Sequence, residues 1–146
     1  MRVIESDLPY FYECAAVIKK HLPYCEITKK HKIIVEDNRY YGLLKIQGKN
    51  AVYDHIILDK TVCNPEFIFK VLTFIFSEAD ICNVFVVWDN IPSQKFTNGL
   101  GFTQTGILRQ IPDALFMYSM TIQEWQKNKI RRHFCNSRTN SKTNIQ

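Results

Sequence analysis

The sequence predicts a mixed α/β fold: a central mixed, twisted sheet with flanking helices. First, its 146 residues are 46% hydrophobic and 13% aromatic, which suffices for one domain with a buried core. Second, segments with strand-like and helix-like apolar spacing alternate along the chain. Third, the purely apolar run 84–87 lies between two helical segments, as expected for a strand inside such a sheet.

The N-terminal segment predicts a short strand followed by a helix. Residues 2–4 form the strand, and Ser6 or Asp7 then offers a helix N-cap, with Pro9 in the first turn. The apolar residues that follow recur every three or four positions, which indicates a helix with one buried face that ends near Pro23. They are Leu8, Phe11, Ala15, Ile18 and Leu22.

A hairpin and a further strand come next. Asp37 and Asn38 form a turn between the strand 32–36 and the return strand 40–46. Another turn at 48–50 leads into the fourth strand at 51–59. These segments therefore predict a β-hairpin followed, after a second turn, by a further strand.

The second half alternates helices and strands. Asn64 caps and Pro65 opens an apolar helix over 65–77, and Thr121 to Glu124 forms a capping box that starts a last helix towards Phe134. Between them we expect a strand at 84–88, a short helix at 93–98, and strands at 102–109 and 114–120. The predicted order is β-α-β-β-β-α-β-α-β-β, with a helical tail.

The segment after the fifth strand carries the most specific pattern. It resembles the C-terminal half of a GNAT (GCN5-related) N-acyltransferase, through Asn90, Ser93, Leu100-Gly101-Phe102, Gly106 and Arg109. A second piece resembles the final strand and the Glu-Trp ending of the branch that acetylates ribosomal-protein N-termini. Its residues are Tyr118-Ser119-Met120 and Glu124-Trp125.

This resemblance implies a GNAT fold and a mechanism. The fourth and fifth strands would run parallel and splay apart, with the helix 65–77 as the crossover between them. Asn90 and Ser93 would line the pantetheine side of an acetyl-CoA cleft between the splayed strands, with 58–60 pairing along it. The implied activity is transfer of an acetyl group from acetyl-CoA to an amine.

The expected phosphate-binding loop departs from the family pattern, Gln/Arg-x-x-Gly-x-Gly/Ala. The candidate cofactor residues here, besides Asn90 and Ser93, are Leu58, Asp59, Lys60 and Asn64. The segment contains no glycine, Pro65 lacks an N–H, and Asp59 and Glu66 add negative charge that Lys60 offsets only in part. The stretch therefore also fits an ordinary helix start.

Several residues are candidates for proton transfer. His55 and Ser93 are the catalytic candidates: His55 titrates nearest neutrality, and the Ser93 hydroxyl can donate to a departing thiolate. Many family members place a Tyr seven residues after the Asn, where this chain has Thr97. The alternative bases are Asp54, Glu36 and Asp89. Because neighbouring side chains on a strand face opposite ways, we expect Asp54 and His55 not to share one cleft.

Charge is concentrated at the C-terminus. The net charge is +5, and residues 127–146 hold six basic and no acidic residues, which leaves −1 for residues 1–126. We therefore expect a GNAT-like domain at 1–126 and, at 127–146, a basic helix and polar tail that projects from the domain to contact another protein chain or an acidic partner. Nucleic acid is a further candidate partner.

The distribution of cysteine, histidine and apolar residues indicates the general class of protein. The five scattered cysteines indicate reduced intracellular thiols, the four dispersed histidines predict no metal site, and no stretch predicts a membrane span. The alternative function is a GNAT-shaped module without catalysis, such as a bacteriophage virion component, that binds a partner through its basic tail. The expected location is cytoplasmic, or the virion if the chain is phage-encoded.

Overall fold

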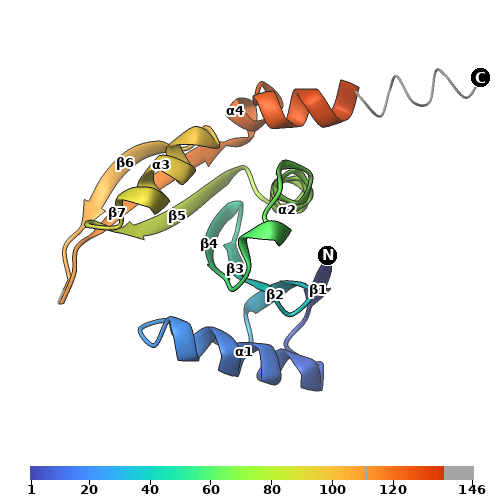
Figure 1. The fold of residues 1–146 in the computed structure, drawn as a ribbon, viewed down its shortest axis with the longest axis vertical. Helices are drawn as coiled ribbons and strands as arrows, with labels where there is room; N and C mark the ends of the chain where they lie inside the picture. Colours follow the sequence, from blue (N-terminus) through green and yellow to red (C-terminus); the bar gives the residue numbers. More distant parts are fainter. Residues whose placement is uncertain (111, 137–146) are drawn as a thin grey trace, which may run out of the picture.

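The computed structural model describes residues 1–110 and 112–136, which form a seven-stranded sheet with helices on both faces (Figure 1). The strands are β1 (Arg2–Ile4), β2 (His31–Glu36), β3 (Tyr40–Gln47), β4 (Asn50–Ile57), β5 (Ile81–Val87), β6 (Thr103–Leu108) and β7 (Leu115–Thr121). The helices are α1 (Pro9–His21), α2 (Pro65–Glu78), α3 (Ile91–Gly99) and α4 (Ile122–Gln126), with a 3-10 turn at Lys60–Val62. Residues 129–136 are also helical.

The sheet is mixed, as predicted. Its strand order is β1-β2-β3-β4-β5-β7-β6, and every neighbouring pair is antiparallel except β4 and β5, which run parallel. The helix α2 connects these two parallel strands, which confirms the predicted crossover.

The parallel pair separates after three residues. Asn50, Ala51 and Val52 pair with Ile81, Cys82 and Asn83. Beyond them, β4 continues to Ile57 and β5 to Val87, and no pairing joins these described stretches. The two strands diverge in Figure 1, which confirms the predicted splay.

Two apolar clusters hold the layers together, one on each face of the sheet. On one face α1 packs against β2, β3 and β4 through Phe11, Cys14 and Ile18. On the other face α2 buries Phe67 and Ile75 among side chains of the sheet. Alternation along the strands supplies both clusters, because neighbouring side chains point to opposite faces.

The start of α1 differs from the prediction. Its N-cap residue is Leu8, without a side-chain hydrogen bond, rather than Ser6 or Asp7. The Ser6 hydroxyl instead donates to the Lys29 carbonyl at 2.8 Å. The Ser6 side chain, which local sequence predicts as a helix cap, is therefore used in a tertiary contact instead.

The predicted last helix is interrupted. The capping box of Thr121 and Glu124 is confirmed, but α4 ends at Gln126. Asn128 then donates its Nδ2 hydrogen to the Leu100 carbonyl at 2.7 Å, and its Oδ1 accepts from the N–H of Ile130 at 2.9 Å. The side chain of Asn128 thus ties the start of the second helix, 129–136, to the end of α3.

This second helix packs on the domain. Phe134 stacks on Phe69 of α2 with ring centroids 5.3 Å apart, and Ile130 also contacts the core. The expectation that the chain projects from about Lys127 is therefore wrong for residues 128–136. Residues 137–146 lie outside the described residues, and the division into 1–126 and 127–146 stays a prediction.

Candidate active site

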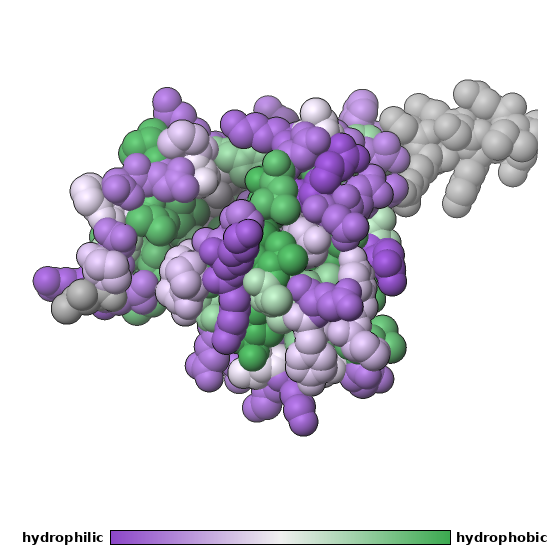
Figure 2. Space-filling model, turned by 60° about the horizontal axis from the view of Figure 1, so that its bottom comes forward, coloured by the Kyte–Doolittle hydropathy of each residue, from purple (hydrophilic) through white to green (hydrophobic). Residues whose placement is uncertain are grey.

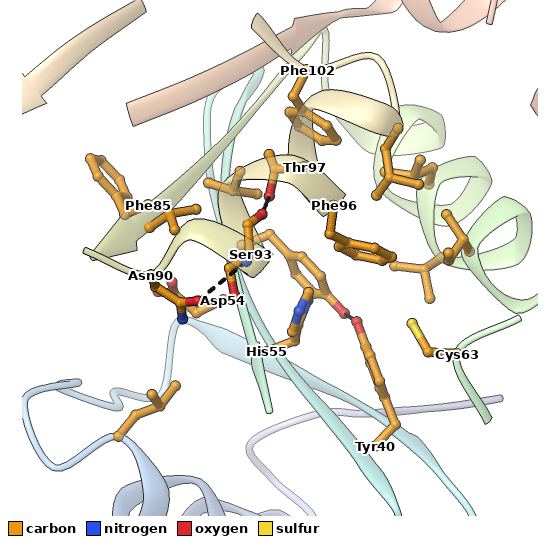
Figure 3. Close-up of a pocket in the computed structure, with 18 of the residues that line it drawn as sticks. Tyr40, Asp54, His55, Cys63, Phe85, Asn90, Ser93, Phe96, Thr97 and Phe102 are labelled. Atoms are coloured by element: carbon orange, nitrogen blue, oxygen red, sulfur yellow. Dashed lines mark hydrogen bonds between the residues drawn. The ribbon is translucent and has the colours of Figure 1, made fainter. Parts of the chain in front are cut away.

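A cleft opens where β4 and β5 separate (Figure 3). Its cavity volume is about 180 Å³, and its walls come from β4, β5, α2 and α3. The lining is mainly apolar, with a few polar groups at the mouth and centre. Its polar side chains include Asp54, His55, Asn90 and Ser93.

Aromatic rings surround His55. The centroid of its ring lies 5.5 Å from that of Tyr40, 6.0 Å from that of Tyr53 and 6.4 Å from that of Phe96. His55 is exposed along the open cleft, but protein groups crowd its ring, and this partial desolvation lowers the pKa of His55 to about 4. His55 is therefore neutral near pH 7.

Asp54 lines the same cleft as His55, which corrects the expectation that the two could not share it. The two side chains do start from opposite faces of β4. However, β4 has no strand partner on its β5 side beyond Val52, so the cleft passes the edge of the strand and both faces reach it. Burial raises the pKa of Asp54 to about 6, so Asp54, not His55, titrates nearer neutrality.

Two tyrosines support this wall, and neither was among the predicted catalytic or cofactor-binding residues. The hydroxyl groups of Tyr40 and Tyr53 form a buried hydrogen bond. The Tyr53 ring packs directly over Gly42 of β3, where any side chain would collide with it. The signal in the sequence was the alternation that puts Tyr53 and His55 on the same face of one strand.

Asn90 and Ser93 lie at the start of α3 and line the cleft, and their role toward acetyl-CoA stays a prediction. The Asn90 Oδ1 accepts from the Ser93 N–H at 3.2 Å and so caps the helix. The Thr97 hydroxyl donates to the Ser93 carbonyl at 2.8 Å, so it is occupied within the helix. The Ser93 hydroxyl makes no hydrogen bond to any other described residue.

Backbone N–H groups of β4 also face the cleft. The N–H of Leu58 donates to the Arg39 carbonyl at 2.7 Å, on the β3 side. Because successive residues of a strand point their N–H groups to alternate edges, those of His55 and Ile57 point to the opposite edge. Beyond Val52 that edge is the cleft, so these two donors are available to a ligand.

In the loop between β4 and α2, backbone N–H groups donate hydrogen bonds to other groups of the same loop, and we call the loop closed for this reason. Asp59 accepts from the N–H and the hydroxyl of Thr61 at 3.0 and 2.8 Å, and these bonds lower the pKa of Asp59. The Asn64 Oδ1 accepts from the Phe67 N–H at 2.8 Å. The N–H groups of Val62 and Cys63 also donate within the loop.

The other predicted site residues lie apart from the cleft. Leu58, Asp59, Lys60 and Asn64 do not line it, although Cys63 between them does. Of the alternative bases, Glu36 pairs with the terminal amino group of Met1 at 2.6 Å, whereas Asp89 is exposed at the end of β5. The structure therefore brings together Asp54, His55, Asn90 and Ser93, and leaves the phosphate-loop candidates outside.

Neither a metal cluster nor a membrane helix is found in the described part of the chain. Within residues 1–110 and 112–136, no three side chains of the metal-binding types gather around one point. None of the helices in these ranges combines the length and the apolar character needed to cross a bilayer.

No protein-family model matches the sequence, and no curated protein sequence matches it. Solved structures do. The ribosomal-protein-S18-alanine N-acetyltransferase of Escherichia coli aligns with a TM-score of 0.62 at 8% identity, over 83% of this chain and 93% of that one. Aminoglycoside acetyltransferase AAC(6')-Ib in complex with coenzyme A gives 0.53 at 10% identity, over 66% and 68%.

A protein of T. thermophilus described as an acetyltransferase gives a TM-score of 0.56 at 17% identity. That match covers 70% of this chain but only 63% of the T. thermophilus protein, so the chain spans less than two thirds of its length. At these identities the comparisons establish a shared fold.

Proposed function

Because the chain has the fold of the GNAT acetyltransferases, we propose that it transfers an acyl group from a pantetheine thioester, with acetyl-CoA as the first donor to test, to a primary amine. One observation carries the proposal. The cleft between splayed β4 and β5 holds unpaired backbone donors, Asn90, Ser93 and a titratable carboxyl in one cavity.

The thioester would lie along β4. Its carbonyl oxygen would accept from the N–H of His55 or Ile57, which stabilises the negative charge that develops on that oxygen during attack. The amine nitrogen forms the new bond to the carbonyl carbon, and the carbon–sulfur bond then breaks. The Ser93 hydroxyl would donate a hydrogen bond to the departing thiolate.

Asp54 is the proton acceptor in this proposal. A primary amine is protonated near pH 7 and must lose a proton before it attacks. Burial raises the pKa of Asp54 to about 6, so the group is mainly a carboxylate at pH 7 yet holds a proton more readily than an ordinary Asp. His55, with a pKa of about 4, is a weak base, and we assign it to the wall beside the thioester.

The test is calorimetric titration of acetyl-CoA into the full chain, with an amine-acetylation assay. Asn90→Asp keeps the oxygen that caps α3 but removes the amide donor, so it should weaken binding by about 1 kcal/mol or somewhat more. Replacing Asn64, Pro65 and Glu66 by glycine should strengthen binding by freeing backbone donors. An affinity that neither change moves would show that the cleft is not a CoA site.

One observation favours a second function. The closed loop leaves the phosphates of CoA without the backbone donors that a glycine-rich loop would present. A domain that binds a protein partner, with no acyl transfer, agrees with that loop and with the basic residues of 127–146. Absence of binding by both acetyl-CoA and acetylpantetheine would select this second function.

A further inference from the structure

A second cavity opens on the α1 face of the sheet, beside the cleft. Its volume is about 280 Å³. It lies between the loop that follows α1 and the ends of β6 and β7, which are far apart in sequence. We call it the α1-side pocket. Three residues, Tyr24, Asp54 and Phe85, line both this pocket and the cleft, so the two meet at the Asp54 carboxyl.

The walls of the α1-side pocket are largely apolar. Leu43 and Phe85 come from the sheet, and Leu108 and Leu115 from the ends of β6 and β7. At the rim, Tyr24 is 60% exposed and Leu108 is 47% exposed. Apolar side chains are visible on the β5–β7 half of the face in Figure 2, beside the β6–β7 turn. Such a wall favours a ligand with an apolar body.

The charge of the α1-side pocket is negative. Its carboxylates are Asp54 at the boundary with the cleft and Glu26 nearer the surface, and no Lys or Arg is among its described lining residues. Lys45 of β3 lies opposite His31 of β2 in the sheet but does not line the pocket.

The other titratable groups of the pocket are uncharged near pH 7. Partial desolvation and the nearby charge of Asp54 raise the pKa of the Tyr24 hydroxyl to about 12 and that of the Cys25 thiol to about 11. Burial, with the nearby charge of Lys45, lowers the pKa of His31. The pocket therefore presents two negative groups and no positive one to a ligand.

We propose that the α1-side pocket selects the acceptor, and that this acceptor is a primary amine with a single positive charge next to an apolar body. The proposal rests on the proposed acyl transfer and adds the substrate class. The ammonium would lie at Asp54, the apolar body against Phe85 and Leu108, and Glu26 would favour the cation at the entrance. Two carboxylates in an apolar pocket suit one ammonium better than a polyamine, whose further charges would lie against Leu108 and Leu115.

The ammonium gives one proton to Asp54, and the free amine adds to the thioester carbonyl. The carbon–sulfur bond then breaks, and the sulfur leaves with its electron pair. The second proton on nitrogen passes to the thiolate, which leaves as a thiol, and Asp54 releases its proton to water. The products are an amide, a thiol and one proton.

The experiment titrates 2-phenylethylamine, and separately spermidine, into the full chain without acetyl-CoA. Leu108→Ser should weaken binding of 2-phenylethylamine about fivefold to tenfold through lost apolar contact. The matched control is Ile107→Ser, since Ile107 is its neighbour on β6, is 60% exposed and does not line the pocket. Glu26→Gln should weaken binding about threefold to tenfold, whereas Glu13→Gln, on exposed α1 surface, should not change it.

If 2-phenylethylamine binds and the variants weaken its binding as expected, the proposed acceptor site is supported. If no acyl transfer is then detected, only the proposed acyl transfer is wrong. Three outcomes overturn it: no measurable binding of 2-phenylethylamine, equal weakening by Leu108→Ser and Ile107→Ser, or tighter binding of spermidine. If spermidine is also the preferred substrate with acetyl-CoA, the transfer stands and the assigned acceptor class is wrong.

Discussion

Burial shifts the two titratable groups of the cleft in opposite senses. Protein groups around the cleft exclude part of the water from both side chains, although His55 keeps an exposed surface, and desolvation penalises whichever form is charged. It therefore raises the pKa of the carboxyl to about 6 and lowers that of the imidazole to about 4. Near pH 7 the cleft holds a carboxylate beside a neutral ring.

Asp54→Asn should stabilise the protein at alkaline pH. Between its ordinary value of 3.8 and about 6, the folded state holds more protons on Asp54 than the unfolded state, so stability falls as pH rises through this window. Asp54 is half-buried, and solvent screening reduces the effect, so we expect a gain of about 1–2 kcal/mol at pH 8. The gain should vanish below about pH 4.

Urea denaturation of both proteins at several pH values measures this difference, and the opposite effect of His55 cancels because both proteins contain it. The exposed Asp89→Asn serves as the control and should give no such pH-dependent gain. If the free energies of unfolding of Asp54→Asn and of the native protein changed in parallel from pH 4 to 8, this would contradict the desolvation of Asp54.

Gly42→Ala tests the packing of Tyr53 behind His55. A methyl group at Gly42 would collide with the Tyr53 ring and hydroxyl. The ring must shift and the Tyr40–Tyr53 hydrogen bond must weaken, so we expect a loss of about 1–3 kcal/mol. Gly99→Ala meets no atom within 4 Å and should leave stability nearly unchanged. Thermal unfolding of the two variants measures this difference in stability.

At the level of elements, the C-terminal helix 129–136 is part of the core despite its basic composition. Its apolar side chains, including Phe134, face α2, and its basic residues face outward or line a shallow hollow beside Asn64. The three basic residues of this helix, Lys129, Arg131 and Arg132, are therefore compatible with packing, because charge on one face of a helix does not prevent burial of the other.

Phe134→Ala should lower the free energy of unfolding by about 1–3 kcal/mol, since Phe134 is partly buried and stacks on Phe69. The control Arg132→Ala, on an exposed position of the same helix, should change it by less than about 0.5 kcal/mol. Chemical denaturation measures both. Equal stability of the two variants would mean that the helix contributes nothing to the core.

At the level of the whole molecule, the sheet is two pieces joined by three parallel residue pairs. The piece formed by β1–β4 carries α1, and the piece formed by β5–β7 carries α3 (Figure 1). Because the pieces separate beyond Val52 and Asn83, the cleft and the α1-side pocket open to opposite faces and meet at Asp54. In the proposed function the acyl donor and the acceptor would therefore approach from opposite sides.

This architecture predicts which part of the acyl donor contributes to binding. In the proposed function the cleft takes the pantetheine arm, whereas the loop that would hold the phosphates is closed by hydrogen bonds of Asp59 and Asn64. Acetylpantetheine, which lacks the nucleotide, should therefore bind within about tenfold of acetyl-CoA, a difference of about 1.4 kcal/mol. Calorimetric titration compares the two ligands. A hundredfold preference for acetyl-CoA would mean that this chain binds the phosphates by contacts other than those loop donors.

The sequence alone determined what local physics controls. Apolar spacing predicted the order of strands and helices, Asn64 with Pro65 marked the start of α2, and the Thr121–Glu124 capping box marked the start of α4. Each of these signals acts within a few residues of the chain. The closed loop also followed from local chemistry, since the absence of glycine and the cap at Asn64 are visible in the sequence.

Only the tertiary structure decided how distant segments meet. Alternation placed Asp54 and His55 on opposite faces of β4, but the end of pairing at Val52 brought both to one cleft. Their pKa values depend on the rings and strands packed around them, and the position of Phe134 depends on α2, more than fifty residues earlier. Burial is a property of the packed chain, because the groups that exclude water from a residue come from other parts of the sequence.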